Sequence, residues 1–70
     1  MRKLRGLGKS IELELTEDEL VMINNALNEA REFVPATEFH ARMGVDVEAV
    51  RRLLTDIHEI LESERGKGGA

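Results

Sequence analysis

The pattern of apolar and polar residues changes several times along this 70-residue chain, and each change predicts a different element. Residues 11–15 alternate strictly, with Ile11, Leu13 and Leu15 on one side and two glutamates on the other. A period of two is typical of a strand with one buried face. Because no second segment alternates in this way, we expect a single short strand whose backbone groups require a partner edge.

The sequence leaves the partner of this strand open. A second copy of the strand or a strand of another protein would each satisfy its backbone groups. A symmetric pairing centred on Leu13 would oppose Glu12 and Glu14, at a cost of roughly a few tenths of a kcal/mol, which another register or a foreign strand avoids. The alternative is an extended segment that packs its three apolar side chains on the helices.

A helical period begins after this strand. Thr16 and Glu19 have the spacing of a capping box, and Pro35 predicts that the helix ends near Phe33. Apolar residues recur at spacings of three and four and form the predicted buried stripe. The stripe contains Leu20, Ile23, Leu27, Ala30 and Val34, widened by Met22, Ala26 and Phe33.

The opposite side of this helix predicts either a solvated face or an interface. Val21 stands there among Asn24, Asn25 and Asn28. Asparagine is a mediocre helix former, so each of the three costs roughly a few tenths of a kcal/mol relative to better residues. The apolar Val21 among them favours an interface, and we treat these four residues, together with the strand, as interface candidates.

Two further helices are predicted, separated by a glycine. Thr37 is expected to cap a helix of about two turns with Phe39 and Met43 facing inward. Gly44 fits the left-handed residue that ends this helix, and Asp46 is expected to cap the third. The third helix should extend to about position 62. Its apolar stripe contains Val47, Val50, Leu54, Ile57 and Leu61, widened by Leu53 and Ile60.

The predicted fold is therefore mainly α: one short N-terminal strand followed by three helices, the last two forming a helix-turn-helix-like corner. The domain should cover residues 11–64, with a flexible basic arm at 1–10 and a disordered, glycine-rich tail at 65–70. A core of this size is marginal, and the chain has no cysteine with which to form a disulfide. A homodimer or a protein partner would bury more apolar surface.

The segment from Thr37 to Leu54 resembles the helix-turn-helix family, with Gly44 at the turn and Val45 as the buried turn residue. His40 departs from the family pattern, which usually has a small residue at that position. The resemblance implies that the last helix would enter the major groove. The nucleic-acid candidates on this interpretation are Arg2, Lys3, Arg5, Arg51 and Arg52. The larger pattern also resembles short bacterial proteins, and that resemblance implies no particular activity.

The distribution of charge disfavours DNA as the partner. The formal net charge is −4, and residues 11–30 carry six acidic and no basic side chains, whereas residues 1–10 carry four basic and no acidic ones. An acidic domain repels nucleic acid on average and suits basic protein partners. Asp46 and Glu48 also stand where a reading helix would approach the DNA.

No pattern in the chain predicts catalysis, a metal or a cofactor. His40 and His58 lie on different predicted elements without close ligand spacing, and no glycine loop has the setting that phosphate binding needs. No apolar run is long enough to span a membrane. We therefore predict a cytoplasmic, non-enzymatic protein-interaction module, an adaptor, regulator or inhibitor of antitoxin or immunity type, dimeric through its strand and helix faces. The alternative is a small helix-turn-helix transcriptional regulator.

Overall fold

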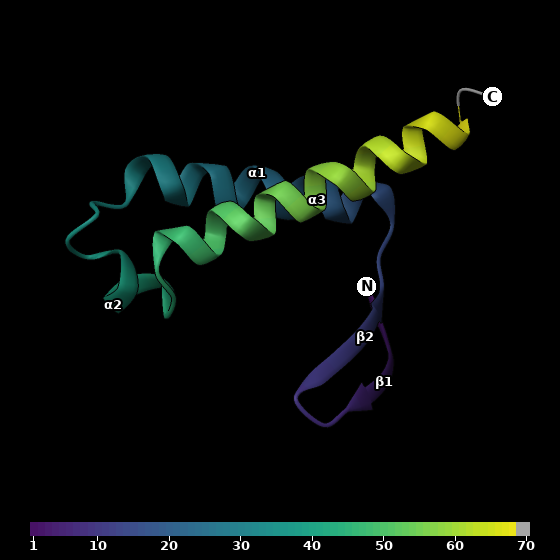
Figure 1. Ribbon diagram of the computed structural model, residues 1–70, viewed down its shortest axis with the longest axis horizontal. Helices are drawn as coiled ribbons and strands as arrows, with labels where there is room; N and C mark the ends of the chain where they lie inside the picture. Colours follow the sequence, from purple (N-terminus) through teal and green to yellow (C-terminus); the bar gives the residue numbers. More distant parts are fainter. Residues whose placement is uncertain (69–70) are drawn as a thin grey trace.

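The chain folds into an N-terminal hairpin followed by three helices (Figure 1). The computed structural model describes residues 1–68. In chain order, the elements of this part are β1 (Arg2–Leu7), β2 (Ser10–Glu14), α1 (Glu17–Phe33), α2 (Phe39–Met43) and α3 (Val47–Gly68). The mainly helical class and the corner formed by the last two helices are confirmed.

The two strands are joined by a two-residue turn at Gly8 and Lys9. Gly8 has a φ of 73° and no other residue of the hairpin has a positive φ. This is the pattern of a type II′ turn, whose twist matches that of the strands it joins and which favours glycine at its first position. The antiparallel register pairs Leu7 with Ser10 and Arg2 with Glu14.

The prediction of a single, unpaired strand with a flexible arm before it is corrected by this hairpin. Residues 2–7 of the arm form β1, which supplies the partner edge that β2 requires. The register shifts between Lys3 and Arg5, so Leu4 occupies a bulge. A bulge inserts one extra residue into a strand and breaks its period of two. For that reason residues 2–7 show no alternating pattern in the sequence.

Helix α1 has the bounds and the caps that the sequence predicted. The Thr16 hydroxyl accepts from the Glu19 backbone N–H at 3.1 Å, and the Glu19 carboxylate accepts from the Thr16 N–H at 2.9 Å. The helix ends at Phe33, and Val34 has an extended conformation with φ −85° and ψ 122°. The proline that follows Val34 disfavours helical geometry there.

The corner between α2 and α3 is built around Gly44, as predicted, but Val45, expected to be the buried residue of the turn, is 43% exposed. The φ of Gly44 is 79°, and its N–H donates to the carbonyl of His40 at 2.8 Å. The start of α2 differs from the prediction, since Glu38 and not Thr37 is the N-cap and makes no capping hydrogen bond with its side chain. Helix α2 is therefore only five residues long, little more than one turn.

Helix α3 is longer than the sequence predicted. It continues through Gly68, so residues 65–68 of the expected disordered tail are helical, and residues 69–70 lie outside the described part of the chain. Glycine weakens a helix by about 1 kcal/mol relative to alanine, which made an earlier end the expected one. Once a helix has formed, however, each added residue gains a hydrogen bond without a new nucleation cost.

The core lies where α1, α2 and α3 meet. Phe39 of α2 is only 2% exposed and packs with Val50 and Leu54 of α3, and residues from all three helices and from the α1–α2 loop close around them. These partly buried neighbours are Leu27, Val34, Met43 and Val47. Phe39 and Met43 therefore face inward as predicted, and the fold depends most on the corner.

The residues predicted to widen the two helical stripes are not part of this core. Met22 and Phe33 of α1 are 63% and 70% exposed, and Leu53 and Ile60 of α3 are 47% and 52% exposed. Helix α1 contains no buried residue at all. The two helices alone are too few to cover apolar stripes of this width.

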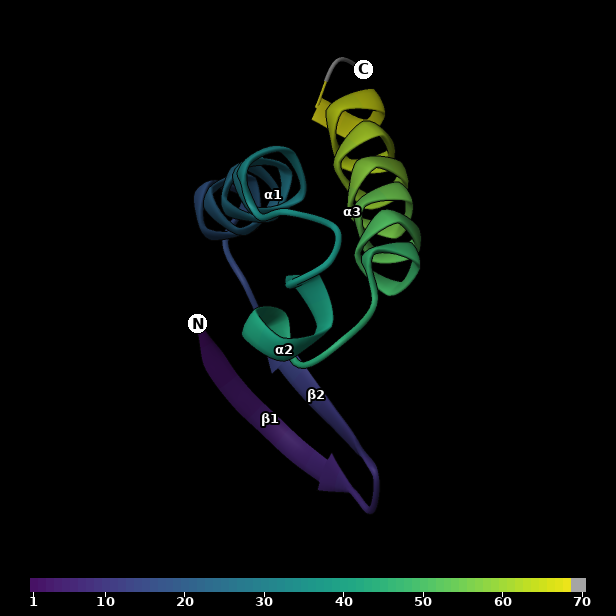
Figure 2. The same cartoon turned by 90° about the vertical axis from the view of Figure 1, so that its left-hand side faces the viewer.

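The hairpin extends away from the helices and makes the molecule open. Figures 1 and 2 show it below α1 and α3, at the start of α1, with α2 under the opposite end of the helix pair. The Cα radius of gyration is 14.0 Å, whereas a compact domain of this length has about 11 Å. The chain therefore leaves more surface in water than its size requires.

Candidate interaction surfaces

The hairpin is the most open part of the described chain. All eleven residues of its two strands are exposed except Glu12, which is half-buried. Ile11 is 64% exposed, and Leu4, Leu7 and Leu13 are also exposed. An isolated two-stranded hairpin is marginally stable at best in water, and a third strand or a packed helix is normally needed. This surface is therefore one that another surface would stabilise.

The three apolar residues of the predicted strand face do not share one environment. Ile11 and Leu13 project from the hairpin and are exposed, whereas Leu15 lies beyond β2 and is half-buried. Leu15 contributes with Leu20 of α1 and Leu61 of α3 to the wall of a hollow of about 300 Å³. Of the predicted strand candidates, Ile11 and Leu13 remain available to a partner.

The asparagine side of α1 is partly engaged within the helix itself. Asn24 and Asn28 are half-buried, as is Val21, while Asn25 is exposed. The Asn28 side-chain amide donates to the Asn24 carbonyl at 3.2 Å, and its oxygen accepts from Arg31 at 3.3 Å. Satisfied polar groups gain little from a partner. An interface role for these residues stays a prediction.

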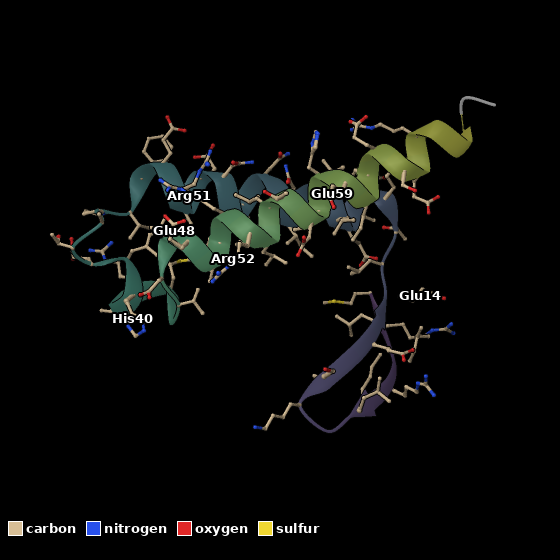
Figure 3. All side chains as sticks on the ribbon, in the orientation of Figure 1. Glu14, His40, Glu48, Arg51, Arg52 and Glu59 are labelled. Atoms are coloured by element: carbon tan, nitrogen blue, oxygen red, sulfur yellow. The ribbon has the colours of Figure 1, made fainter. Side chains whose placement is uncertain are left out.

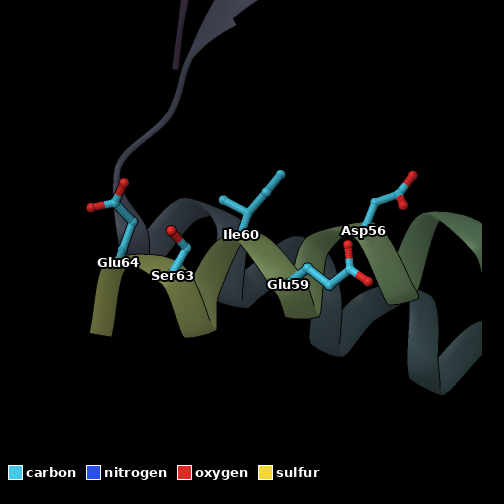
Figure 4. Close-up of a pocket in the computed structure, with 5 residues that line it drawn as sticks. All are labelled: Asp56, Glu59, Ile60, Ser63 and Glu64. Carbon is cyan, nitrogen blue, oxygen red and sulfur yellow. The ribbon is translucent and has the colours of Figure 1, made fainter. Parts of the chain in front are cut away.

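A surface around Ile60 was not predicted from the sequence. Ile60 of α3 stands between Asp56, Glu59 and Glu64, which line a hollow with it (Figure 4). Ile60 also borders the hollow formed by Leu15 and its neighbours. We call the surface around Ile60, with these three acidic residues, the Ile60 surface. In the sequence Ile60 appears at the edge of an amphipathic stripe, and only the structure shows that its side chain is 52% exposed.

The nucleic-acid candidates are dispersed, and three of the five are already paired. Arg2 binds Glu14 at 3.0 Å and Arg5 binds Glu12 at 2.9 Å across the hairpin. Arg51 binds Glu48 at 2.7 Å on α3. These candidates are Arg2, Lys3 and Arg5 on β1 and Arg51 and Arg52 on α3, and all are exposed.

The leading end of α3 carries opposite charges close together. Figure 3 shows Glu48, Arg51 and Arg52 near the start of this helix. Phosphate binding would require the Arg51 guanidinium to exchange its carboxylate partner for a phosphate, and the Glu48 carboxylate would then face the DNA. The Glu48–Arg51 pair therefore offsets part of the positive charge at this end of the helix.

The start of α1 is tied to the base of the hairpin by an electrostatic contact. The Met1 amine donates to the Glu19 carboxylate, which also accepts from the Thr16 backbone N–H. The amine contributes most, and the Thr16 N–H next, to lowering the pKa of the Glu19 carboxyl below its ordinary value. Hairpin and helix are thus joined at the capping box.

The described part of the chain offers no constellation for a metal ion. Within residues 1–68, no group of three or more His, Cys, Asp and Glu side chains could hold one. His40 lies on α2 and His58 on α3, and both are exposed. None of the described helices combines the length and the apolar character that a membrane span requires.

Comparison with known proteins gives no assignment. No family model matches the chain, and neither the curated proteins nor the solved structures contain a significant match. Fold alone does not identify an activity, so the function has to be argued from the surfaces themselves.

Proposed function

We propose that this protein is a small, acidic, non-enzymatic interaction module of the cytoplasm that works as a dimer. One observation carries the proposal: the chain exposes 5632 Å² of surface. A compact folded monomer of 7.9 kDa exposes about 4,400 Å². The excess of about 1,200 Å² exceeds the roughly 800 Å² that each partner buries in a standard interface.

The chemistry of the excess surface supports a protein as the partner. Large apolar side chains are exposed on the hairpin, α1 and α3, and they include residues of the predicted interface. Monomeric proteins rarely expose contiguous apolar patches of more than a few hundred Å². Association is also the remaining means of enlarging a core of this size, since the chain has no cysteine. An adaptor, regulator or inhibitor acts by binding another protein, and exposed apolar surfaces of this kind are sufficient for such binding.

Light scattering after size exclusion at micromolar concentration tests the proposal, and we expect the mass of a dimer. The variant Leu13→Pro should shift the protein toward monomer, because proline removes a strand donor and disrupts the hairpin. Leu13→Val is the matched control and should remain dimeric. A wild-type protein that stays monomeric at all accessible concentrations, melts cooperatively and binds no protein in stoichiometric amount would contradict the proposal.

A DNA-binding regulator is the second candidate. The corner at Gly44, between α2 and α3, favours it, together with the basic strand β1. If it is correct, a selection from random duplexes should yield one sequence that binds with nanomolar affinity near physiological ionic strength. We expect instead weak, non-specific binding at low salt. Tight binding that is lost in Arg51→Ala and Arg52→Ala variants would favour the regulator over the interaction module.

A further inference from the structure

We propose that the hairpin of one copy docks on the Ile60 surface of a second copy, and that the exchange is reciprocal. This inference rests on the proposed function, because it names the partner and the site of the dimer. The occupant of the Ile60 surface is then residues 1–14 of the other chain. The argument has three parts: apolar complementarity, charge complementarity and the fixed direction of the hairpin.

The apolar residues of the two surfaces are exposed in the described chain. Ile11 and Leu13 are exposed on β2, and Ile60 is 52% exposed on α3, with Leu53 two turns before it on the same side of the helix. Residues seven apart lie on one face of an α-helix. Ile60 borders two hollows, so a side chain from the hairpin can enter beside it. Seating the hairpin there would give its β2 residues a packed surface.

The charges of the two parts are opposite. Residues 1–15 carry four basic and two acidic side chains, whereas residues 16–68 carry six basic and twelve acidic ones. The rim of the Ile60 surface is acidic, with Asp56, Glu59 and Glu64. The ion pairs within the described residues include neither Lys3 nor Lys9 of the hairpin. Complementary potentials of this kind orient and accelerate association.

The hairpin cannot reach the same surface of its own chain without loss. The Thr16–Glu19 capping box fixes the chain direction at the start of α1, and the Met1 amine contacts the same Glu19 carboxylate. Leu15, which links β2 to the helix, is half-buried and lines a hollow with Leu20 and Leu61. A fold-back would have to break the cap and expose Leu15 further. A second copy reaches the Ile60 surface with both features intact.

The reciprocal arrangement accounts for the area that the chain leaves exposed. In a two-fold symmetric dimer every contact occurs twice, so each chain gives one hairpin and receives one. The surface covered on each chain then combines the hairpin with the Ile60 surface.

Cross-linking between two different chains tests the contact directly, because the natural chain has no cysteine. A Leu13→Cys chain is mixed with an Ile60→Cys chain and treated with a short bis-maleimide. The control mixture replaces Ile60→Cys by Thr55→Cys, an exposed position on another side of α3. We expect about tenfold more hetero-cross-linked dimer in the first mixture, because proximity raises the effective concentration of the two thiols.

Charge reversal tests the same contact without a cross-linker. The double variant Asp56→Lys/Glu59→Lys should weaken the dimer by about tenfold or more, because it sets like charges against the hairpin. The control Glu29→Lys/Glu32→Lys makes the same change of charge at the same spacing on exposed positions of α1. We expect the control to retain the wild-type dimerisation constant, and circular dichroism to show that both variants are folded.

The outcomes separate this inference from the proposed function. A wild-type dimer with equal cross-linking at Ile60→Cys and Thr55→Cys, and equal weakening by both charge variants, would overturn the inference and leave the interaction module standing. Cross-linking within a single Leu13→Cys/Ile60→Cys chain that persists on dilution would also overturn it, in favour of a fold-back. A folded wild-type monomer that binds no protein would remove the proposed function as well.

Discussion

The hairpin and the helical corner each contain a turn at a glycine with positive φ, but only the corner buries side chains. Gly8 turns the chain between β1 and β2 with a φ of 73°, and Gly44 turns it between α2 and α3 with a φ of 79°. At the corner, the turn brings Phe39 against Val50 and Leu54 and creates the core. At the hairpin, the turn brings two strands together and buries no side chain.

The difference follows from how each element satisfies its backbone. A helix hydrogen-bonds to itself, so α2 and α3 need only bury one stripe to be stable. A two-stranded hairpin leaves both outer edges unpaired and normally requires a further strand or a packed helix. The corner is thus complete within one chain and the hairpin is not. This contrast is why the hairpin, and not the corner, is the element to which we assign the dimer contact.

The largest expected effect tests the core side of the comparison. Phe39→Ala should lower the free energy of unfolding by about 3–5 kcal/mol, because it removes a ring that is nearly fully buried. The total free energy of unfolding of a small domain is only about 5–15 kcal/mol, so the variant should be largely unfolded at moderate temperature. Thermal denaturation followed by circular dichroism measures this effect. A melting temperature close to that of the wild type would mean that the core lies elsewhere.

The two turn glycines provide a matched pair of variants with a smaller effect. Gly44→Ala should cost about 1–2 kcal/mol of stability, because alanine is strained at positive φ. No atom lies near the position of the added methyl group at either glycine, so the cost of Gly8→Ala also comes from the positive φ of the backbone. We expect Gly8→Ala to leave the melting of the helices nearly unchanged in dilute monomer and to weaken dimerisation. Equal loss of helix stability in both variants would show that hairpin and corner fold as one unit.

The smallest effect concerns the junction between the two regions. Thr16→Ala should cost about 1 kcal/mol, because it removes the side-chain half of the capping box. Thr16→Ser retains the hydroxyl and is the control, expected to differ little from the wild type. Chemical denaturation monitored by circular dichroism has the required precision. A loss as large as that of Phe39→Ala would instead indicate that the hairpin contributes to the core through this junction.

The parts of the fold that the sequence predicted are those set by local chemistry. The capping box at Thr16 and Glu19, the stop before Pro35 and the glycine turn at position 44 each act within a few residues, and each was recognised. Strand β1 was missed because the bulge at Leu4 breaks its alternation. The extension of α3 was missed because its last residues are unfavourable locally but continue an existing helix.

The candidate site was less predictable, because it depends on which surfaces the fold leaves open. Ile60 and Leu53 have the spacing of core residues, yet the fold leaves them 52% and 47% exposed. The ion pairs of Arg2 and Arg5 could not be predicted from the sequence either. They depend on the register between β1 and β2, and β1 itself was not predicted. Exposed apolar surface is a tertiary property and has no local signature.

Hydrogen exchange of the hairpin amides at several protein concentrations tests the central claim most directly. Amides are protected when their hydrogen bonds open rarely, and a marginal hairpin opens often unless another surface covers it. We predict that protection of residues 2–14 increases with protein concentration, while protection in the corner around Val50 and Leu54 stays constant in the same samples. Hairpin protection that is already high in dilute monomer, and does not change with concentration, would contradict the claim that a second copy completes this part of the fold.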